Sequence, residues 1–457
     1  MSAEETYMAN ETPKKTVDGD EVILFTKEMK RDYKILVPTM LPMHFRMIVK
    51  ILGTFGYDID ILDEYGKHIS ECGLKYVHND TCYPAILVIG QFINALQSGK
   101  YDPDKTALLL MQTGGGCRAS NYISLLRKAL KKAGYPQVPV ISFNLAGVEK
   151  HPGFQLTLPI LHRLMYAVFY GDLLMLLRNQ CTPYELEQGA AQRLAEQWTD
   201  RLVNEMNEKG ALKYKHVKEN YAAMVRDFAK IPKIDVKKVR VGVVGEIFVK
   251  YSPLGNNNLE KFLTSEGAEV VVPGLMDFCL YCLVNGIYDT ELYGTGKLRA
   301  FASKIIYKIF LKKQQDIIDV ICENSDFNPP TLFSVTTGLV DGYISHGTKM
   351  GEGWLLCAEM LELIHMGVDN IVCTQPFGCL PNHIAGKGMM KPIKEKHEGV
   401  NIVAIDYDAG ATQINQENRL KLMLSTARAN LDENEQKVRQ KAENGGIINK
   451  KAEEIYK

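Results

Sequence analysis

The chain has 457 residues, of which 46% are hydrophobic and 24% are charged, with 54 basic and 54 acidic side chains. This length predicts roughly two to four domains. Because the charges balance, the protein has no overall positive field, and we expect neither nucleic acid nor a membrane as a partner.

The N-terminal residues carry no export signal. Residues 1–30 are predicted to be a leader, disordered up to about Asp20, because the first part is polar, mixed in charge and without an apolar core. The longest apolar run, residues 85–96, is too short to span a bilayer. Without export, the ten cysteines predict reduced thiols, metal ligands or core residues in a cytoplasmic protein, not disulfides.

Residues 31–152 form the first predicted α/β domain. Strands alternate there with helices, which predicts a parallel, doubly wound sheet. The predicted strands are residues 34–39, 58–62, 106–112 and 138–144; the predicted helices are residues 43–55, a helix opening at Cys82, and residues 120–133.

Two cysteines of this domain stand at predicted helix starts. Cys82 lies two residues before Pro84, and proline is favoured in the first turn of a helix. Cys117 follows a strand and the glycine turn of residues 113–116. Ligands bind at the carboxyl edge of such sheets, and the free N–H groups of a helix start favour negative charge. We therefore expect thiolates to form more readily at these positions.

Residues 153–235 contain no predicted strand and are expected to be a helical insertion. Its helices are predicted over residues 156–178, 184–207 and 213–230. Cys181-Thr182-Pro183 repeats the Cys-x-Pro pattern, with Thr182 as a possible N-cap. Because no strand precedes it, we favour a role for Cys181 other than metal ligand.

A second α/β unit is predicted over residues 236–330 and 331–430, followed by a charged tail, residues 431–457. The strands are expected at 239–247, 269–272, 370–374 and 401–406, and the helices at 258–266, 276–284, 298–322, 352–365 and 413–429. Cys279 and Cys282 share an apolar helix and are predicted to be a core pair, with metal binding as the alternative. The lysines of the 298–322 helix are predicted to face solvent, with a docking surface as the alternative. The two units could be distant copies of one architecture.

Cys379 is the third cysteine at a predicted helix start. It follows a buried strand and the turn of residues 375–378, and it precedes Pro381. If the fold brings Cys82, Cys117 and Cys379 together, they form a three-thiolate site with one position open. The alternative for each is a small buried apolar residue.

Long motifs surround these cysteines, and other distinct motifs lie elsewhere in the chain. They are residues 79–85, 113–122, 244–251, 351–354, 375–383, 406–410 and 415–422. Together they resemble the 2-hydroxyacyl-CoA dehydratase and benzoyl-CoA reductase family of iron–sulfur proteins, and within it the activase-related branch. The likeness runs from about residue 30 to residue 428.

The resemblance implies a cofactor, a reaction and partners. Cys82, Cys117 and Cys379 would hold a 4Fe–4S cluster whose open iron takes substrate or solvent. An acyl-CoA thioester would lose its 2-hydroxyl group after one-electron reduction, with electrons from an ATP-dependent activase on a separate chain. A second dehydratase-like subunit or a homodimer is a further expectation. The alternatives are an electron-transfer or accessory subunit without acyl-CoA chemistry of its own, and a structural metal protein that binds zinc.

Three side chains are candidates for catalytic proton transfer. Glu246 ends a predicted strand, Glu352 starts a helix, and His383 lies in the first turn after Cys379. Their plainer alternatives are a salt bridge from Glu246 to Lys250, a helix-start carboxylate at Glu352 and a backbone hydrogen bond at His383.

Arg118, Ser120 and Asn121 are candidates for binding the cofactor, because they follow Cys117 and can donate hydrogen bonds to a cluster or an anion. Capping by Ser120 is the alternative. His78 precedes the Cys82 motif and is a weaker candidate, and residues 345–347 and 351–353 are expected in a pocket wall. The chain has no G-x-x-x-x-G-K-S/T loop, so we expect it not to bind ATP in that way.

Overall fold

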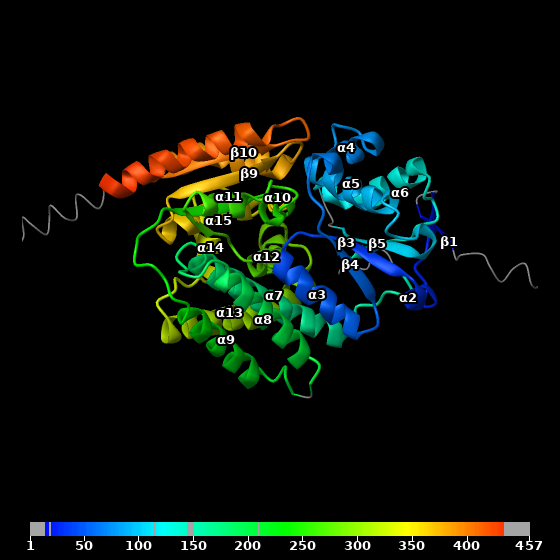
Figure 1. Cartoon of the computed structure of the whole chain (residues 1–457), viewed down its shortest axis with the longest axis horizontal. Helices are drawn as coiled ribbons and strands as arrows, with labels where there is room; N and C mark the ends of the chain where they lie inside the picture. Colours follow the sequence, from blue (N-terminus) through cyan, green and yellow to red (C-terminus); the bar gives the residue numbers. More distant parts are fainter. Residues whose placement is uncertain (1–13, 18–19, 113–115, 144–149, 209, 434–457) are drawn as a thin grey trace, which may run out of the picture.

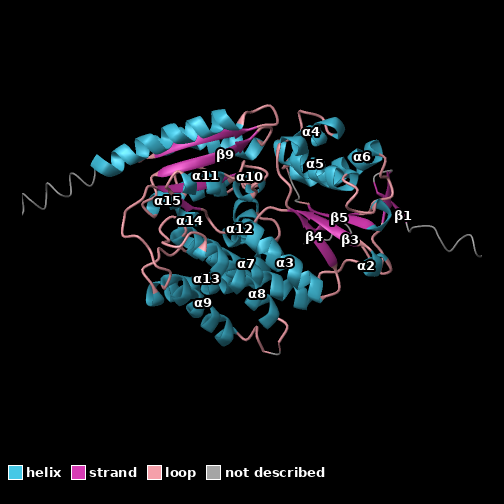
Figure 2. Ribbon diagram, in the orientation of Figure 1, coloured by secondary structure: helices cyan, strands magenta, loops and turns pink. Residues whose placement is uncertain are grey.

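The computed structural model describes residues 14–17, 20–112, 116–143, 150–208 and 210–433 (Figure 1). Two four-stranded parallel sheets flanked by helices confirm the predicted α/β class. The sheets lie on opposite sides of the molecule, and a layer of helices that includes α7, α8 and α9 lies below them in the view of Figure 2.

The first sheet has the strand order β4-β3-β5-β6. Its strands are β3 Lys34–Pro38, β4 Asp58–Leu62, β5 Thr106–Met111 and β6 Val140–Phe143. All neighbours are parallel. Ile35, Leu36 and Leu108 are almost fully buried, as expected for strands covered on both faces. The strand order reverses between β3 and β5, because β4 lies on one side of β3 whereas β5 and β6 lie on the other. Doubly wound sheets bind ligands at such a switch point.

Helices cover this first sheet. They are α2 Met29–Asp32, α3 Pro42–Thr54, α4 Lys67–Tyr76, α5 Tyr83–Gln97, η2 Pro103–Lys105, η3 Arg118–Asn121 and α6 Tyr122–Ala133. Residues 113–115 and 144–149, which include part of the predicted glycine turn and the end of a predicted strand, lie outside the described residues.

The second sheet has the order β8-β7-β9-β10, which is the same pattern when its strands are counted along the chain. Its strands are β7 Arg240–Gly245, β8 Glu269–Val271, β9 Asn370–Pro376 and β10 Asn401–Tyr407, and all neighbours are parallel. The shared order agrees with the idea that the two units repeat one architecture, and it places a second reversal between β7 and β9.

The second unit has more helices than the first. They are α10 Ile247–Tyr251, α11 Leu259–Ser265, α12 Leu275–Tyr293, α13 Lys297–Asn324, α14 Phe333–Leu339, α15 Trp354–His365, η4 Asn382–Gly386, η5 Lys387–Met389 and α16 Met390–Lys396. Residues 413–433 are also helical. Beyond them, residues 434–457, most of the predicted tail, are outside the described residues.

The predicted helical insertion is present as α7 Leu158–Cys181, α8 Ala190–Glu205 and α9 Tyr214–Ala229. Within the described ranges, α7 is the one helix long and apolar enough to cross a membrane, and 56% of its most apolar window is buried. It packs against α3 of the first unit and against β8 and α12 of the second. Its apolar length therefore serves the core that joins the two units.

Two predictions in this insertion were wrong. Cys181 ends α7 and does not open a helix: its buried thiol lies 3.6 Å from the Phe228 carbonyl oxygen, and the Thr182 hydroxyl donates to the Arg178 carbonyl at 2.8 Å. The second helix begins at Ala190, not near residue 184. The backbone of residues 184–186 before it hydrogen-bonds instead to residues 232–234. Those backbone groups are therefore not available for helical hydrogen bonds.

The predicted leader also differs from the structure. Strands β1 Lys14–Val17 and β2 Asp20–Ile23 form an antiparallel hairpin, so the expectation of disorder was wrong for residues 14–17. The missed signal is the Asp-Gly pair between the strands, which is typical of two-residue hairpin turns. Residues 1–13 lie outside the described residues.

Helices α12 and α13 expose more apolar surface than predicted. Cys279 is partly buried but Cys282 is exposed, so the core-pair prediction was wrong for Cys282. The lysines at 304, 308 and 312 are exposed as expected, but Lys313 is half-buried and donates to the Tyr166 hydroxyl at 2.9 Å. Leu298 and Phe301, which precede these lysines, are 84% and 65% exposed. This part of α13 extends beyond the core, whereas its later turns bury Ile317 and Ile321.

Candidate functional site

The three cysteines stand at helix starts, as the sequence predicts. Cys82 is the N-cap residue of α5 and Cys117 that of η3, both with extended backbone. Cys379 follows β9 and directly precedes the helical residues that begin at Leu380. Cys82 and Cys379 are buried, and Cys117 is partly exposed.

The Cys82 loop of the first unit touches the Cys379 loop of the second. The Tyr83 backbone N–H donates to the Phe377 carbonyl oxygen at 3.0 Å. Gly378 has a φ of +74°, and a Cβ atom there would lie 3.0 Å from the Cys82 Cα atom. It would also lie 3.2 Å from Nη1 of Arg118. Only glycine fits this close approach without moving the loops apart.

A loop of the second unit covers Cys117. Gly351, with a φ of +58°, would carry a Cβ atom 3.7 Å from the Cys117 sulfur and 3.0 Å from Cγ of Pro381. A Cβ atom on Gly116 would lie 2.4 Å from the Met350 sulfur. The loops that carry the three cysteines therefore meet at the junction of the two sheets.

Two carboxylates share the start of α10 at this junction. The Glu246 Oε2 atom accepts from the Val249 N–H, and the Glu352 Oε1 atom accepts from the Ile247 N–H, each at 2.9 Å. Burial and the charge of Glu352 raise the pKa of Glu246 to about 8, and burial raises the pKa of Glu352. Such a pair holds a proton near neutral pH. The alternative salt bridge from Glu246 to Lys250 is absent, because the Lys250 ammonium bonds to Glu359 at 2.7 Å.

The thiols are harder to ionise than the sequence suggested. Burial raises the pKa of Cys82 and of Cys379, and it raises that of Cys117 to about 11. The charges of Glu246 and Glu352 raise the Cys117 and Cys379 values further. The expectation of ready thiolates is therefore wrong for the metal-free protein, because desolvation and two nearby carboxylates outweigh the helix starts. A bound metal would reverse this, since thiols that ligate a metal lose their protons.

Tyr122 is a site residue that sequence reasoning missed. Its hydroxyl lies 2.9 Å from the Cys82 sulfur. Burial, followed by the charges of Cys82 and Glu246, raises the pKa of Tyr122. The phenol therefore keeps its proton and can donate it to the sulfur as a hydrogen bond. The available signal was its place at the end of the glycine-cysteine motif, five residues after Cys117.

The smaller candidates contact mainly backbone. His383 is exposed, and its Nδ1 atom lies 2.7 Å from the Cys379 carbonyl oxygen, as in its plainer alternative. Ser120 donates to the Cys117 carbonyl at 2.8 Å, which is the capping alternative. Arg118 donates to the Asp80 carbonyl and so ties the Cys117 loop to the Cys82 loop. Asn121 is exposed and makes no side-chain cap on α6.

His78 is exposed at the surface, where its Nδ1 atom accepts from the Asp80 N–H at 3.2 Å. It therefore orders the turn before Cys82 and does not reach into the junction.

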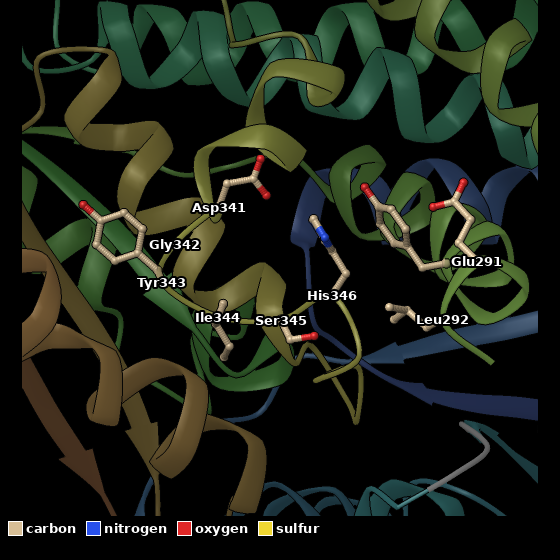
Figure 3. A pocket seen from close by; sticks show the side chains of 9 residues that line it. Glu291, Leu292, Asp341, Gly342, Tyr343, Ile344, Ser345 and His346 are labelled. Carbon is tan, nitrogen blue, oxygen red and sulfur yellow. The ribbon is translucent and has the colours of Figure 1, made fainter.

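An open depression of about 470 Å³ lies between α12 and the segment of residues 341–346 (Figure 3). Ser345 and His346 line it, together with Glu291 and Leu292 from α12, but Gly347 and residues 351–353 do not, so this depression is not the pocket predicted beside the cysteines. Glu352 and the three cysteines do not line it. His346 stacks on Tyr288 with ring centroids 4.1 Å apart, so it serves packing. The depression is separate from the junction.

Among the residues that the structure describes, no three His, Cys, Asp or Glu side chains are grouped so as to hold one metal ion. Cubane thiolates bind different iron atoms, so this finding concerns a single-ion site and not a cluster. No model of a known protein family matches the sequence, and no curated protein matches it.

Proposed function

We propose that this chain is the iron–sulfur component of a 2-hydroxyacyl-CoA dehydratase-like system in the cytoplasm. The observation that carries the proposal is the meeting of the Cys82, Cys117 and Cys379 loops beside the buried carboxylate of Glu352 and the half-buried carboxylate of Glu246. These thiols would hold a 4Fe–4S cluster with one iron left open. The motif resemblance supplies the substrate class, an acyl-CoA thioester, and the electron source, a separate ATP-dependent activase.

The residues at the junction fit such a cluster. Gly378 and Gly351 leave room where side chains would separate the loops, and the Tyr122 hydroxyl can donate to a ligand sulfur. An anionic cluster beside two carboxylates is disfavoured when both are ionised. The raised pKa of Glu246, about 8, removes that conflict near neutral pH.

When bound, the cluster supplies one electron and an open iron site for a substrate oxygen. The protein's part is proton transfer. Loss of a hydroxyl group from an acyl chain needs a proton for the departing oxygen and a base for the adjacent C–H group. Glu246 and Glu352 share the start of one helix and hold a proton between them, so one can donate while the other accepts.

Iron and sulfide analysis after anaerobic reconstitution tests the cluster. We expect Cys82→Ser, Cys117→Ser and Cys379→Ser each to lose iron and sulfide. Cys181→Ser is the matched control, because Cys181 also precedes x-Pro and is buried, but it lies at the end of α7. Iron retained in all three variants would overturn the assignment. Zinc bound without sulfide would favour the structural metal site.

Acyl-CoA binding separates the proposed enzyme component from an electron-transfer or accessory subunit. In the enzyme component, 2-hydroxyacyl-CoA added anaerobically changes the spectrum of the reconstituted cluster. Glu246→Gln is expected to preserve this change and to lose turnover with activase. A reconstituted cluster that does not respond to acyl-CoA favours the accessory role.

A further inference from the structure

A second group of acidic side chains is buried beneath the junction. Asp277 on α12 and Glu359 and Glu362 on α15 are 3%, 1% and 3% exposed. Glu352 lies just outside α15, which begins at Trp354 after Gly353 with a φ of +45°. Burial and, to a smaller extent, the charge of Glu352 raise the pKa of Glu359, so the carboxyl groups of the junction and of the buried group are close enough to interact.

The positive charge next to these three carboxyl groups is too small to neutralise them if all are ionised. Lys250, itself 3% exposed, bonds to Glu359, and Gln314 donates to Asp277 at 2.9 Å. One oxygen of Glu359 and one of Glu362 have no hydrogen-bond partner.

Asp172 on α7 and Arg240 on β7, in elements next to these carboxyl groups, bring no further cation to them. On α7, Asp172 accepts from the backbone at the start of α12 and from His44 at 2.8 Å. On β7, Arg240 is paired with Glu269 at 3.1 Å. Within the described part of the chain, Lys250 is the only cation that bonds directly to any of the three carboxyl groups, and it bonds to Glu359 alone.

A cavity of about 80 Å³ adjoins the cluster. Asp277, Glu362, Asp172 and Gln314 line it, and the exposed Asn328 lies at its rim. One buried water needs roughly 10–15 Å³ of such space and two or more polar partners. The cavity therefore has room for several waters, and although most of its lining side chains are apolar, Asp277, Glu362 and Gln314 supply the polar partners that such waters need.

We propose that Asp277, Glu359 and Glu362 form a buried proton store, which holds more than one proton at neutral pH and exchanges protons with the Glu246–Glu352 pair through Lys250 and the cavity water. Three buried carboxylates beside one cation cannot all remain ionised. Burial also raises the pKa of Asp277 to about 8 and raises those of Glu359 and Glu362. Each proton that leaves is replaced from solvent at the Asn328 rim. The store requires no iron–sulfur cluster; only delivery to Glu246 and Glu352 rests on the proposed function.

Charge measurement on the metal-free protein tests the store. If Glu362 is protonated at pH 7, Glu362→Gln does not change the net charge, and its electrophoretic mobility under native conditions equals that of the wild type. Glu395→Gln is the matched control, because Glu395 is exposed on α16. Its replacement removes one negative charge, so the mobility should shift by the amount that corresponds to one charge. Asp277→Asn is expected to behave like Glu362→Gln, and thermal unfolding confirms that each variant folds. A one-charge shift in both buried variants would overturn the store.

Infrared spectroscopy and kinetics separate storage from delivery. The wild type should show the C=O stretch of a protonated carboxyl group at pH 7, and Glu362→Gln should lose part of it. In the reconstituted enzyme with activase, Glu362→Gln should shift the pH profile of acyl-CoA turnover. An unchanged profile beside a confirmed infrared band would overturn delivery alone. Absence of any cluster would refute the proposed function while the charge and infrared results still decide the store.

Discussion

In the first α/β unit, Cys82, Cys117 and the Tyr122 hydroxyl stand at helix starts beside the carboxyl edge of the sheet. In the second, Cys379 stands there with Glu246 and Glu352. The strand order is the same in both sheets. One architecture thus carries mostly sulfur on one side of the junction and mostly carboxylate on the other. Neither unit alone contains the candidate site, which depends on contacts between their loops.

The interiors of the two units also differ in their content of carboxylates, which is again higher in the second unit. Among the described residues, the buried polar side chains of the first unit include His44, Gln91 and Ser142 but no carboxylate. The second unit buries Glu269, Asp277 and three glutamates of the α15 region. Buried carboxylates are costly and need a compensating role. The comparison suggests that proton handling belongs to the second unit, and the following changes test this division.

The largest effect is expected for Lys250→Met. It removes the one cation bonded to Glu359 and leaves a buried carboxyl group unpaired, which costs about 3–5 kcal/mol of unfolding free energy. Denaturant unfolding measures this loss. The double variant Lys250→Met/Glu359→Leu should recover most of it, because no unpaired charge remains. If the double variant is as unstable as the single one, the lysine acts through packing and not through its charge.

Gly378→Ala tests the contact between the units. The positive φ alone costs about 1 kcal/mol for alanine, and the contact with Cys82 should bring the total to about 2–3 kcal/mol. Gly294→Ala is the control, because Gly294 has a φ of +70° and no atom within 4 Å of its Cβ position. We expect Gly378→Ala, but not Gly294→Ala, to lose iron after reconstitution. If Gly378→Ala and Gly294→Ala lose the same stability, the Cys379 loop is not in close contact with the Cys82 loop at Gly378.

The raised pKa of Glu246 predicts how stability depends on pH. The folded protein holds this proton up to about pH 8, whereas the unfolded chain releases it near its ordinary value of 4.5. The folded state therefore binds more protons between these values, and stability falls as pH rises through that window by about 1.4 kcal/mol per pH unit for each such group. Glu246→Gln should flatten this slope in the metal-free protein. A slope that is unchanged in Glu246→Gln would contradict the raised pKa.

Much of the fold followed from local sequence signals, and the site followed only in part. Strand β4 and the helix start at Cys82 were predicted because β-branched runs and Cys-x-Pro act within a few residues. The raised pKa values of the thiols were not, because they depend first on burial and then on the charges of carboxylates such as Glu246, which is far from Cys82 and Cys117 in the chain. The alternative for Glu246 was a salt bridge to its sequence neighbour Lys250, yet the partner of Lys250 is Glu359, 109 residues away. Long-range packing sets these electrostatic relations, and no local pattern encodes them.

The smallest effect is expected for Tyr122→Phe, on the first unit's side of the junction. The variant removes one hydrogen bond to the Cys82 sulfur and should cost about 1 kcal/mol of stability. Its iron and sulfide content should match the wild type, because the phenol is not a ligand. A hydrogen bond to a cluster thiolate favours the more negative, reduced state, so its loss should lower the reduction potential in an anaerobic redox titration. A potential equal to that of the wild type would place the Tyr122 hydroxyl outside the cluster environment.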